Sequence, residues 1–134
     1  ITLWHVLEHL ENLEEYIFLL KNLLTNDGKL VIAVPNYKSY DADFYQEYWA
    51  AYDVPRHLWH FSKKSIVNLF SLVNLKVEQT LPMKFDSYYV SLLSEKYKKG
   101  KFKPLKSFYI GFLSNLKAKK TKEYSSQIFV LKNG

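Results

Sequence analysis

Residues 30–34 form an uninterrupted apolar run, LVIAV, which Pro35 ends. A run of this length and composition predicts a strand that is buried on both faces, as strands in parallel sheets are. A sheet that is buried on both faces needs helices to cover it, so this segment restricts the fold more than any other. The sequence therefore predicts the α/β class.

The residues before this strand follow the alternation expected of that class. Residues 1–4 are apolar and predict the end of another buried strand. Residues 13–24 carry apolar side chains at helical spacing, and Asn12 with Glu15 has the pattern of a capping box. Gly28 is expected to end this helix in a left-handed conformation.

The residues after the strand continue the alternation. Ser62 is expected to cap a second helix. The apolar face of that helix consists of Ile66, Val67, Phe70 and Val73. Asn74 suits the next turn because asparagine tolerates positive φ. Residues 75–81 alternate as a strand and residues 127–132 form a last one, so right-handed crossovers would place the helices on the faces of one sheet.

Two segments leave the carboxyl ends of the first two strands, the edge at which open α/β sheets bind ligands. They are HVLEHL, residues 5–10, and PNYKSYDADFYQEYW, residues 35–49. Imidazole and carboxylate groups occur in the first segment, and carboxylate and phenol groups are frequent in the second. We therefore expect any chemistry to take place in these two segments.

Composition excludes several classes of protein. The chain has no cysteine, which excludes a disulfide scaffold and a thiolate metal site and suits the cytoplasm. Its net charge is +6, but residues 96–122 hold ten lysines and no acidic residue, while the rest has nine basic and thirteen acidic residues. Because the basicity belongs to one segment, we expect no nucleic-acid binding.

A basic helical insertion at about residues 82–122 is expected to contain one long helix that begins near Pro104. Its apolar stripe consists of Leu105, Phe108, Tyr109, Phe112, Leu113 and Leu116. Residues 104–122 then have two alternatives. In the first, they lie on an anionic membrane surface, which would make the protein membrane-peripheral. In the second, their apolar stripe packs on the domain or on a second subunit.

The order of the motifs resembles that of class I S-adenosylmethionine-dependent methyltransferases. Strand four of that family resembles the segment TLWHVLEHL, and strand five resembles the segment LLTNDGKLVIAVPN. The helix between these two segments corresponds to the helix that follows strand four. DVPRHLWHFS resembles the branch of ubiquinone-type O-methyltransferases, and EYSSQIFVLK resembles the antiparallel seventh strand. The resemblance implies a partial Rossmann-like methyltransferase sheet, strands four to seven, with flanking helices and the last strand antiparallel.

The resemblance also implies roles for particular residues. The residues that it places beside the cofactor S-adenosylmethionine are Leu3, Trp4 and His5. The residues that it places beside a small organic or lipid-linked acceptor are Asn36, Tyr37, Tyr40 and Trp49. The alternative for these aromatic side chains is to pack a lid or an interface. His57 or His60 is a candidate catalytic base, because imidazole titrates near neutral pH.

A divalent metal site is a further hypothesis. Some relatives carry Glu-x-x-Glu-His where this chain has HVLEH, and they bind a divalent metal. The candidate ligands here are His5, Glu8 and His9, with His57 or His60. Such nitrogen and oxygen donors suit zinc or another transition ion. The alternatives are that Glu8 and His9 make structural hydrogen bonds, or that one histidine is a base without a metal.

One departure from the family concerns its cofactor site. The family holds the cofactor with a glycine-rich turn after its first strand, and none of the four glycines here lies in such a turn. We therefore expect residues 1–134 to be the carboxyl-terminal part of a methyltransferase domain, inactive as a fragment. The alternatives are a noncatalytic interaction module that pairs through an exposed sheet edge, as a homodimer does, and a different nucleotide-binding α/β protein.

Overall fold

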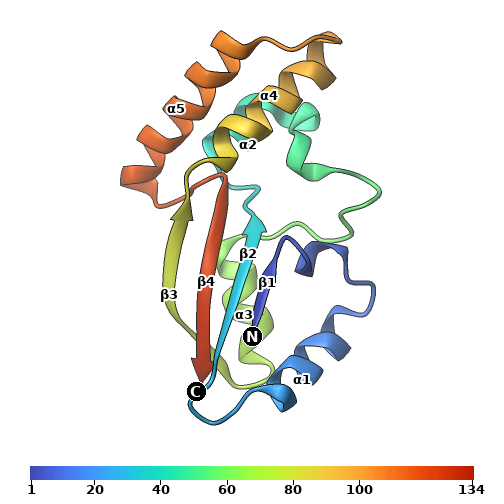
Figure 1. Ribbon diagram of the computed structural model, residues 1–134, viewed down its shortest axis with the longest axis vertical. Helices are drawn as coiled ribbons and strands as arrows, with labels where there is room; N and C mark the ends of the chain where they lie inside the picture. The colour runs from blue at the N-terminus through green and yellow to red at the C-terminus, as the bar shows by residue number, and fades with distance from the viewer.

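The computed structural model describes residues 1–134, and four strands form one mixed sheet (Figure 1). The strands are β1 (Thr2–Trp4), β2 (Lys29–Pro35), β3 (Leu75–Met83) and β4 (Ser126–Asn133). Their spatial order is β1-β2-β4-β3, with β1 parallel to β2 and β4 antiparallel to both of its neighbours. The predicted α/β class and the antiparallel last strand are confirmed.

The helices divide into two groups (Figure 1). The first group packs along the sheet and consists of α1 (Leu13–Leu23) and α3 (Lys63–Ser71). The second group lies beyond the carboxyl ends of β2 and β3 and consists of α2 (Tyr40–Tyr45), α4 (Asp86–Lys99) and α5 (Pro104–Thr121). Short 3-10 turns complete the chain: η1 (Leu7–His9), η2 (Gln46–Tyr48) and η3 (Ala50–Tyr52). The second group therefore covers one end of the sheet.

Each group of helices has its own apolar cluster. The apolar run of β2 contributes Leu30, Ile32 and Val34 to the first cluster, between the sheet, α1 and α3. Each such buried side chain stabilises the fold by roughly 1.5–3 kcal/mol. The second cluster lies among the other helices and includes Tyr45 and Trp49, both buried. The end of the sheet is therefore a boundary between two packed units.

The beginning and the end of α1 differ from the prediction. Asn12 makes no cap hydrogen bond, because its ψ of 70° is not extended, and its amide donates to Glu15 over 3.3 Å instead. Gly28 does not have a positive φ, since α1 already ends at Leu23. A Cβ atom at position 28 would lie 2.8 Å from Thr25 Oγ1, so a larger residue would require neighbouring side chains to shift.

The start of α3 and the turn after it form as predicted. Ser62 and Ser65 exchange hydrogen bonds between side chain and backbone in a capping box. Asn74 adopts a φ of 56°, in the left-handed region that asparagine tolerates. Ser62 therefore fixes the start of α3, and Asn74 fixes the turn between α3 and β3.

The basic insertion is a hairpin of two helices, because α4 precedes the expected helix α5. Residues 82 and 83 complete β3 and lie outside the hairpin. Gly100, with a φ of 70°, ends α4, and Pro104 begins α5. Neither these helices nor any other in the chain is long and apolar enough to cross a membrane.

Candidate functional site

The two histidine-containing segments meet in the structure although they are far apart in sequence. The turn η1 lies against residues 56–59. The backbone N–H of Leu58 donates to the carbonyl of Glu8 over 2.8 Å. The indole of Trp59 donates to the carbonyl of Leu10 over 2.7 Å. These bonds hold His57 beside the residues that follow β1.

His5 lies between two carboxylates. It follows β1 with a φ of 51°, a conformation that histidine adopts more readily than most residues. Its Nδ1 atom is 3.2 Å from Glu8 Oε1, and its Nε2 atom is 3.2 Å from Asp86 Oδ2. The hydrogen bond to Asp86, and then the one to Glu8, raise the pKa of His5 to about 9. At neutral pH His5 is therefore an imidazolium without a lone pair for a proton or a metal.

Glu8, His9 and His57 form a group of potential metal ligands, in which one ligand atom of each residue lies within 4.8 Å of the others. Glu8 is buried, and its Oε2 atom has no hydrogen-bond partner. The Nδ1 atom of His9 bonds to the carbonyl of Arg56 over 3.0 Å, and that of His57 to the carbonyl of Ala51 over 2.8 Å. Because a carbonyl only accepts, Nδ1 carries the proton of each neutral ring and Nε2 keeps its lone pair.

A cavity of about 330 Å³, here called the strand-end cavity, opens at the carboxyl ends of the parallel strands. His5 and His57 line it together with Asp53 and Asp86. One wall comes from α4 and consists of Tyr89, Val90, Leu93 and Tyr97. The cavity therefore combines an apolar wall with titratable groups at the edge where the sequence predicted chemistry.

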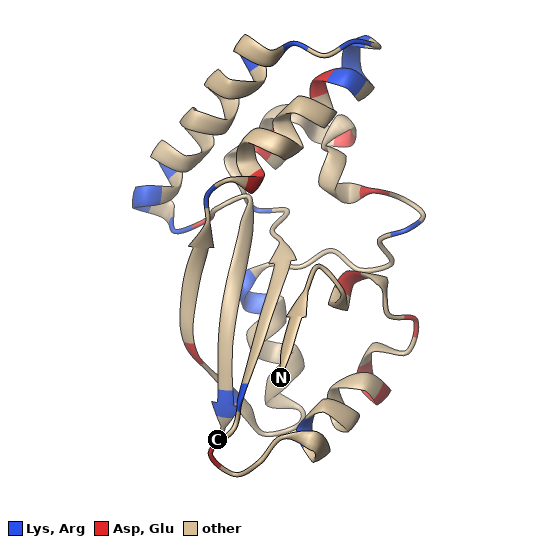
Figure 2. Cartoon of the chain, in the orientation of Figure 1, with Lys and Arg blue, Asp and Glu red and all other residues tan.

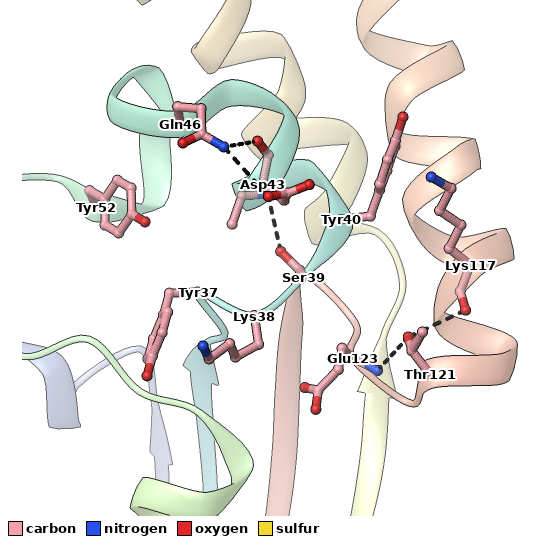
Figure 3. A pocket seen from close by; sticks show the side chains of 11 residues that line it. Tyr37, Lys38, Ser39, Tyr40, Asp43, Gln46, Tyr52, Lys117, Thr121 and Glu123 are labelled. Carbon is pink, nitrogen blue, oxygen red and sulfur yellow. Dashed lines mark hydrogen bonds between the residues drawn. The ribbon is translucent and has the colours of Figure 1, made fainter.

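A second cavity of about 440 Å³, here called the tyrosine cavity, lies between α2 and the end of α5 (Figure 3). Tyr37, Tyr40 and Tyr52 line it, as do Lys38 and Lys117. The Nζ atom of Lys117 is 3.6 Å from the centroid of the Tyr40 ring, a cation–π contact. Two of the predicted acceptor-binding residues, Tyr37 and Tyr40, thus line the tyrosine cavity and not the strand-end cavity.

The other two predicted acceptor-binding residues are buried and line neither cavity. The amide of Asn36 donates to Glu123 Oε2 over 2.8 Å. The indole of Trp49 donates to Asp41 Oδ2 over 2.8 Å. Both side chains join the loop after β2 to other elements.

The remaining predicted residues lie outside the strand-end cavity. His60 Nε2 bonds to the carbonyl of Tyr52 over 3.0 Å. Leu3 packs partly buried against the first cluster, and Trp4 is 51% exposed at the edge of the sheet. Of the four predicted metal ligands, the structure brings Glu8, His9 and His57 together, while both ring nitrogens of His5 face carboxylates.

Sequence reasoning missed three aspartates. Asp86 follows the carboxyl end of β3, so the rule that pointed to the first two strands would have found it. Asp53 Oδ2 lies 3.8 Å from His57 Nε2. Asp41 is buried, and no local pattern signals its role. Its hydrogen-bond donors are Trp49, Ser114 and Ser125.

Solved structures of the methyltransferase fold resemble the chain. The cyclase SpnF has 10% identity and a TM-score of 0.57 over 98% of this chain and 48% of its own. The cyclopropane synthase MmaA2 from Mycobacterium tuberculosis has 10% identity and a TM-score of 0.54 over 98% of this chain and 54% of its own. Phosphoethanolamine N-methyltransferase 2 from Haemonchus contortus has 12% identity and a TM-score of 0.53 over 98% of this chain and 32% of its own. This chain thus spans about half the length of these proteins or less, and at such identity the likeness concerns the fold alone.

No functionally curated protein matches the chain. A family model described as a methyltransferase domain matches residues 1–80, more than half of the 134 residues. The match includes β1, β2 and α3, and both His5 and His57 lie within it. It decides against the alternative of a different nucleotide-binding α/β protein. The chain belongs to the methyltransferase domain family.

Proposed function

We propose that this chain forms the acceptor-binding part of an S-adenosylmethionine-dependent methyltransferase. The observation that supports the proposal is the strand-end cavity, which lies where open α/β sheets bind ligands, in a chain of this family. When bound, S-adenosylmethionine supplies an electrophilic methyl group. The residues of the chain then have to orient the accepting atom and take up its proton.

The residues of this chain do not fit a complete cofactor site. The connections that follow the parallel strands, residues 5–6, 36–39 and 84–85, contain no glycine. No glycine-rich turn therefore brings backbone N–H groups close to a ligand. We propose that Leu3, Trp4 and His5 are the part of this chain beside the cofactor. The 134-residue chain should show no measurable affinity for S-adenosylmethionine in titration calorimetry, and a micromolar dissociation constant would contradict this.

The proposed acceptor is a small organic molecule or the end of a lipid-linked one. The cavity volume of about 330 Å³ is near the lower end of ligand pockets, which span roughly 300–1,000 Å³. Val90 and Leu93 provide an apolar surface, and His57 and Asp53 provide polar groups. This combination suits an acceptor with an apolar body and one hydroxyl or amine group.

His57 is the proposed proton acceptor. Its Nδ1 atom is occupied by the carbonyl of Ala51, so Nε2 is the basic atom. Nε2 lies 3.8 Å from Asp53 Oδ2 and 4.0 Å from Glu8 Oε1. Two carboxylates at this range would stabilise the imidazolium that forms when the acceptor loses its proton. His5 is already protonated, and this makes His57 the better base.

Methyl transfer tests the proposal. The protein that carries this chain should transfer a radiolabelled methyl group from S-adenosylmethionine to a member of a panel of phenols, amines and their lipid-linked forms. His57→Asn should lower kcat by about 10²–10⁴-fold. Leu72→Ala, at a side chain that is 61% exposed, is the matched control and should leave kcat unchanged. If His60→Asn abolishes transfer and His57→Asn does not, the base is His60.

We also propose that Glu8, His9 and His57 bind a transition-metal ion such as Zn²⁺. The buried Oε2 atom of Glu8 favours this, because an unpartnered carboxylate oxygen in the interior is costly and a cation would satisfy it. Two imidazole nitrogens and a carboxylate are ligands that Zn²⁺ accepts. The backbone carbonyls that bond both Nδ1 atoms leave Nε2 of each ring as the nitrogen available to a metal. A metal-bound His57 has no free lone pair, so this proposal and the base assignment exclude each other.

Titration calorimetry with Zn²⁺ separates the two assignments. Glu8→Gln and His9→Ala should each weaken Zn²⁺ binding by about 10-fold or more, since each removes a ligand. His60→Ala is the control for adventitious binding by surface histidines. An equal loss in His60→Ala, or no binding by the unaltered chain, would contradict the metal proposal and leave His57 as the base.

A further inference from the structure

The two faces of α5 differ from those of an ordinary amphipathic helix. Its buried residues are mostly small, and they pack toward α4 and α2: Ser107, Ile110, Gly111, Ser114 and Ala118. Its large apolar residues are exposed: Leu105, Phe108, Tyr109, Phe112 and Leu116. The sequence alternative in which the stripe packs on the domain is therefore wrong for Leu105, Tyr109, Phe112 and Leu116, while the Phe108 ring stacks on Tyr88 of α4 at a centroid distance of 5.1 Å. The rest of the apolar stripe lies on the opposite side of the helix and faces outward.

The extent of this exposure is large. Leu105 is 90% exposed, Phe108 63% and Phe112 49%. The five residues recur at i, i+3, i+4, i+7 and i+11, so they form one continuous stripe along a helix of about 27 Å. Single exposed apolar residues are common, but a contiguous stripe of this length indicates a surface that binds something.

The charges around the stripe indicate what it binds. Residues 96–122 hold ten lysines and no acidic residue. Figure 2 shows these lysines gathered at the two ends of α5 and at the end of α4. Lys106 pairs with the buried Glu95 over 2.6 Å, and Lys117 contacts Tyr40. The exposed lysines without an ion-pair partner include Lys99, Lys101, Lys119, Lys120 and Lys122.

We propose that the outer face of α5 docks on an anionic lipid bilayer and lies parallel to its surface. The aromatic and aliphatic side chains would enter the boundary between headgroups and acyl chains, and the lysines at both ends would contact anionic headgroups. A second copy of the chain fits less well, because a symmetric contact through this face would bring two lysine clusters together. A nucleic acid would use the lysines and leave the apolar stripe without a partner. The proposal is independent of the reaction that the protein catalyses.

Vesicle co-sedimentation of the 134-residue chain tests the proposal. Vesicles of phosphatidylcholine with phosphatidylserine should bind the chain at low salt, and pure phosphatidylcholine vesicles should bind it weakly. Raising the salt should weaken binding, because salt screens exposed charges. Reversing the charge of Lys119, Lys120 and Lys122 together should weaken binding by on the order of 100-fold.

The apolar stripe is tested separately. Leu105→Asp and Phe112→Asp should each weaken vesicle binding by about 10-fold or more. Leu72→Asp is the control, since Leu72 is 61% exposed at the end of α3, outside the basic segment, and its loss should not affect binding. Circular dichroism of each variant checks that the fold is kept.

Three results would overturn the proposal. The first is that the folded chain does not bind anionic vesicles at low salt. The second is that binding survives both substitutions in the stripe, which would assign the lysines to polyanions such as nucleic acid. The third is a dimer that Leu105→Asp dissociates without any vesicle binding, which would assign the face to a second copy.

Discussion

The chemistry of His5 follows from the conformation of its own backbone. With a φ of 51°, the chain turns sharply after β1, and the ring lies between Glu8 and Asp86. Both carboxylates favour the protonated ring. The residue that the family resemblance placed beside the cofactor is therefore a fixed positive charge at the strand-end cavity.

We expect His5 to stabilise the fold only while it is protonated. Its pKa is raised from 6.5 to about 9, so the stabilisation is complete below the lower value and is lost as pH rises through the higher one. At pH 6, His5→Gln should lower the free energy of unfolding by about 1 kcal/mol, a small value because water screens a partly exposed pair. At pH 10 the two proteins should be equally stable. Urea unfolding at both pH values measures this, and a pH-independent difference would contradict it.

Asp41 connects four segments of the chain. It lies in α2 and accepts hydrogen bonds from Trp49, from Ser114 of α5 and from Ser125 before β4, at 2.6 to 2.8 Å. Asp41→Ala should lower the free energy of unfolding by about 3 kcal/mol, because three buried donors lose a charged acceptor. Asp43→Ala, at an exposed position of the same helix, should change it by less than about 0.5 kcal/mol. Equal effects of the two substitutions in urea unfolding would contradict this role.

At the scale of the elements, the hairpin of α4 and α5 depends on close approach of the two helices. A Cβ atom on Gly111 would lie 2.9 Å from the Cα atom of Tyr88 and 3.0 Å from the carbonyl oxygen of Ser87. The hydroxyl of Ser87 also donates to the carbonyl of Gly111 over 3.1 Å. The small residues of α5 therefore set the distance between the helices, and the large ones are left outside.

Gly111→Ala should destabilise the hairpin although alanine is the better helix former. The preference of alanine for helix is worth about 1 kcal/mol, and overpacking against a backbone typically costs about 1–3 kcal/mol. We expect a net loss in the free energy of unfolding and a lower melting temperature by circular dichroism. Lys119→Ala, at an exposed position of the same helix, is the control and should have almost no effect. A stabilised Gly111→Ala variant would show that the helices can separate at little cost.

At the scale of the whole molecule, the sheet has an open edge at β1. β1 pairs on one side only, with β2, and Ile1 and Trp4 are 44% and 51% exposed there. On the neighbouring α1, Phe18 and Leu19 are also half exposed. Unpaired strand edges beside apolar surface recruit other chains.

We therefore expect the 134-residue chain to self-associate through this edge. Light scattering should show a dimer or larger species at high protein concentration. Trp4→Lys should shift the chain toward the monomer, because a lysine on an edge strand opposes pairing, and Val67→Lys on α3 is the matched control. A monomer that persists at high concentration would contradict the prediction.

The sequence by itself determined the features that depend on neighbouring residues. The apolar run of β2, the capping box at Ser62 and the left-handed Asn74 are local signals, and the structure confirms all three. The edge of the sheet at which the strand-end cavity opens also followed from the order of strands and helices. Family resemblance identified the fold, and the comparisons confirm it.

Only the tertiary structure decided which groups meet and which way each surface faces. His5 meets Asp86 and Glu8 meets His57 because β3 and the loop at residues 56–59 come to the same end of the sheet, and no local pattern contains these distances. The periodicity of α5 showed one apolar stripe, but a period is the same whether the stripe faces a core or the solvent. The close approach of α4 at Gly111 decides that question, since only the small side of α5 fits against another backbone.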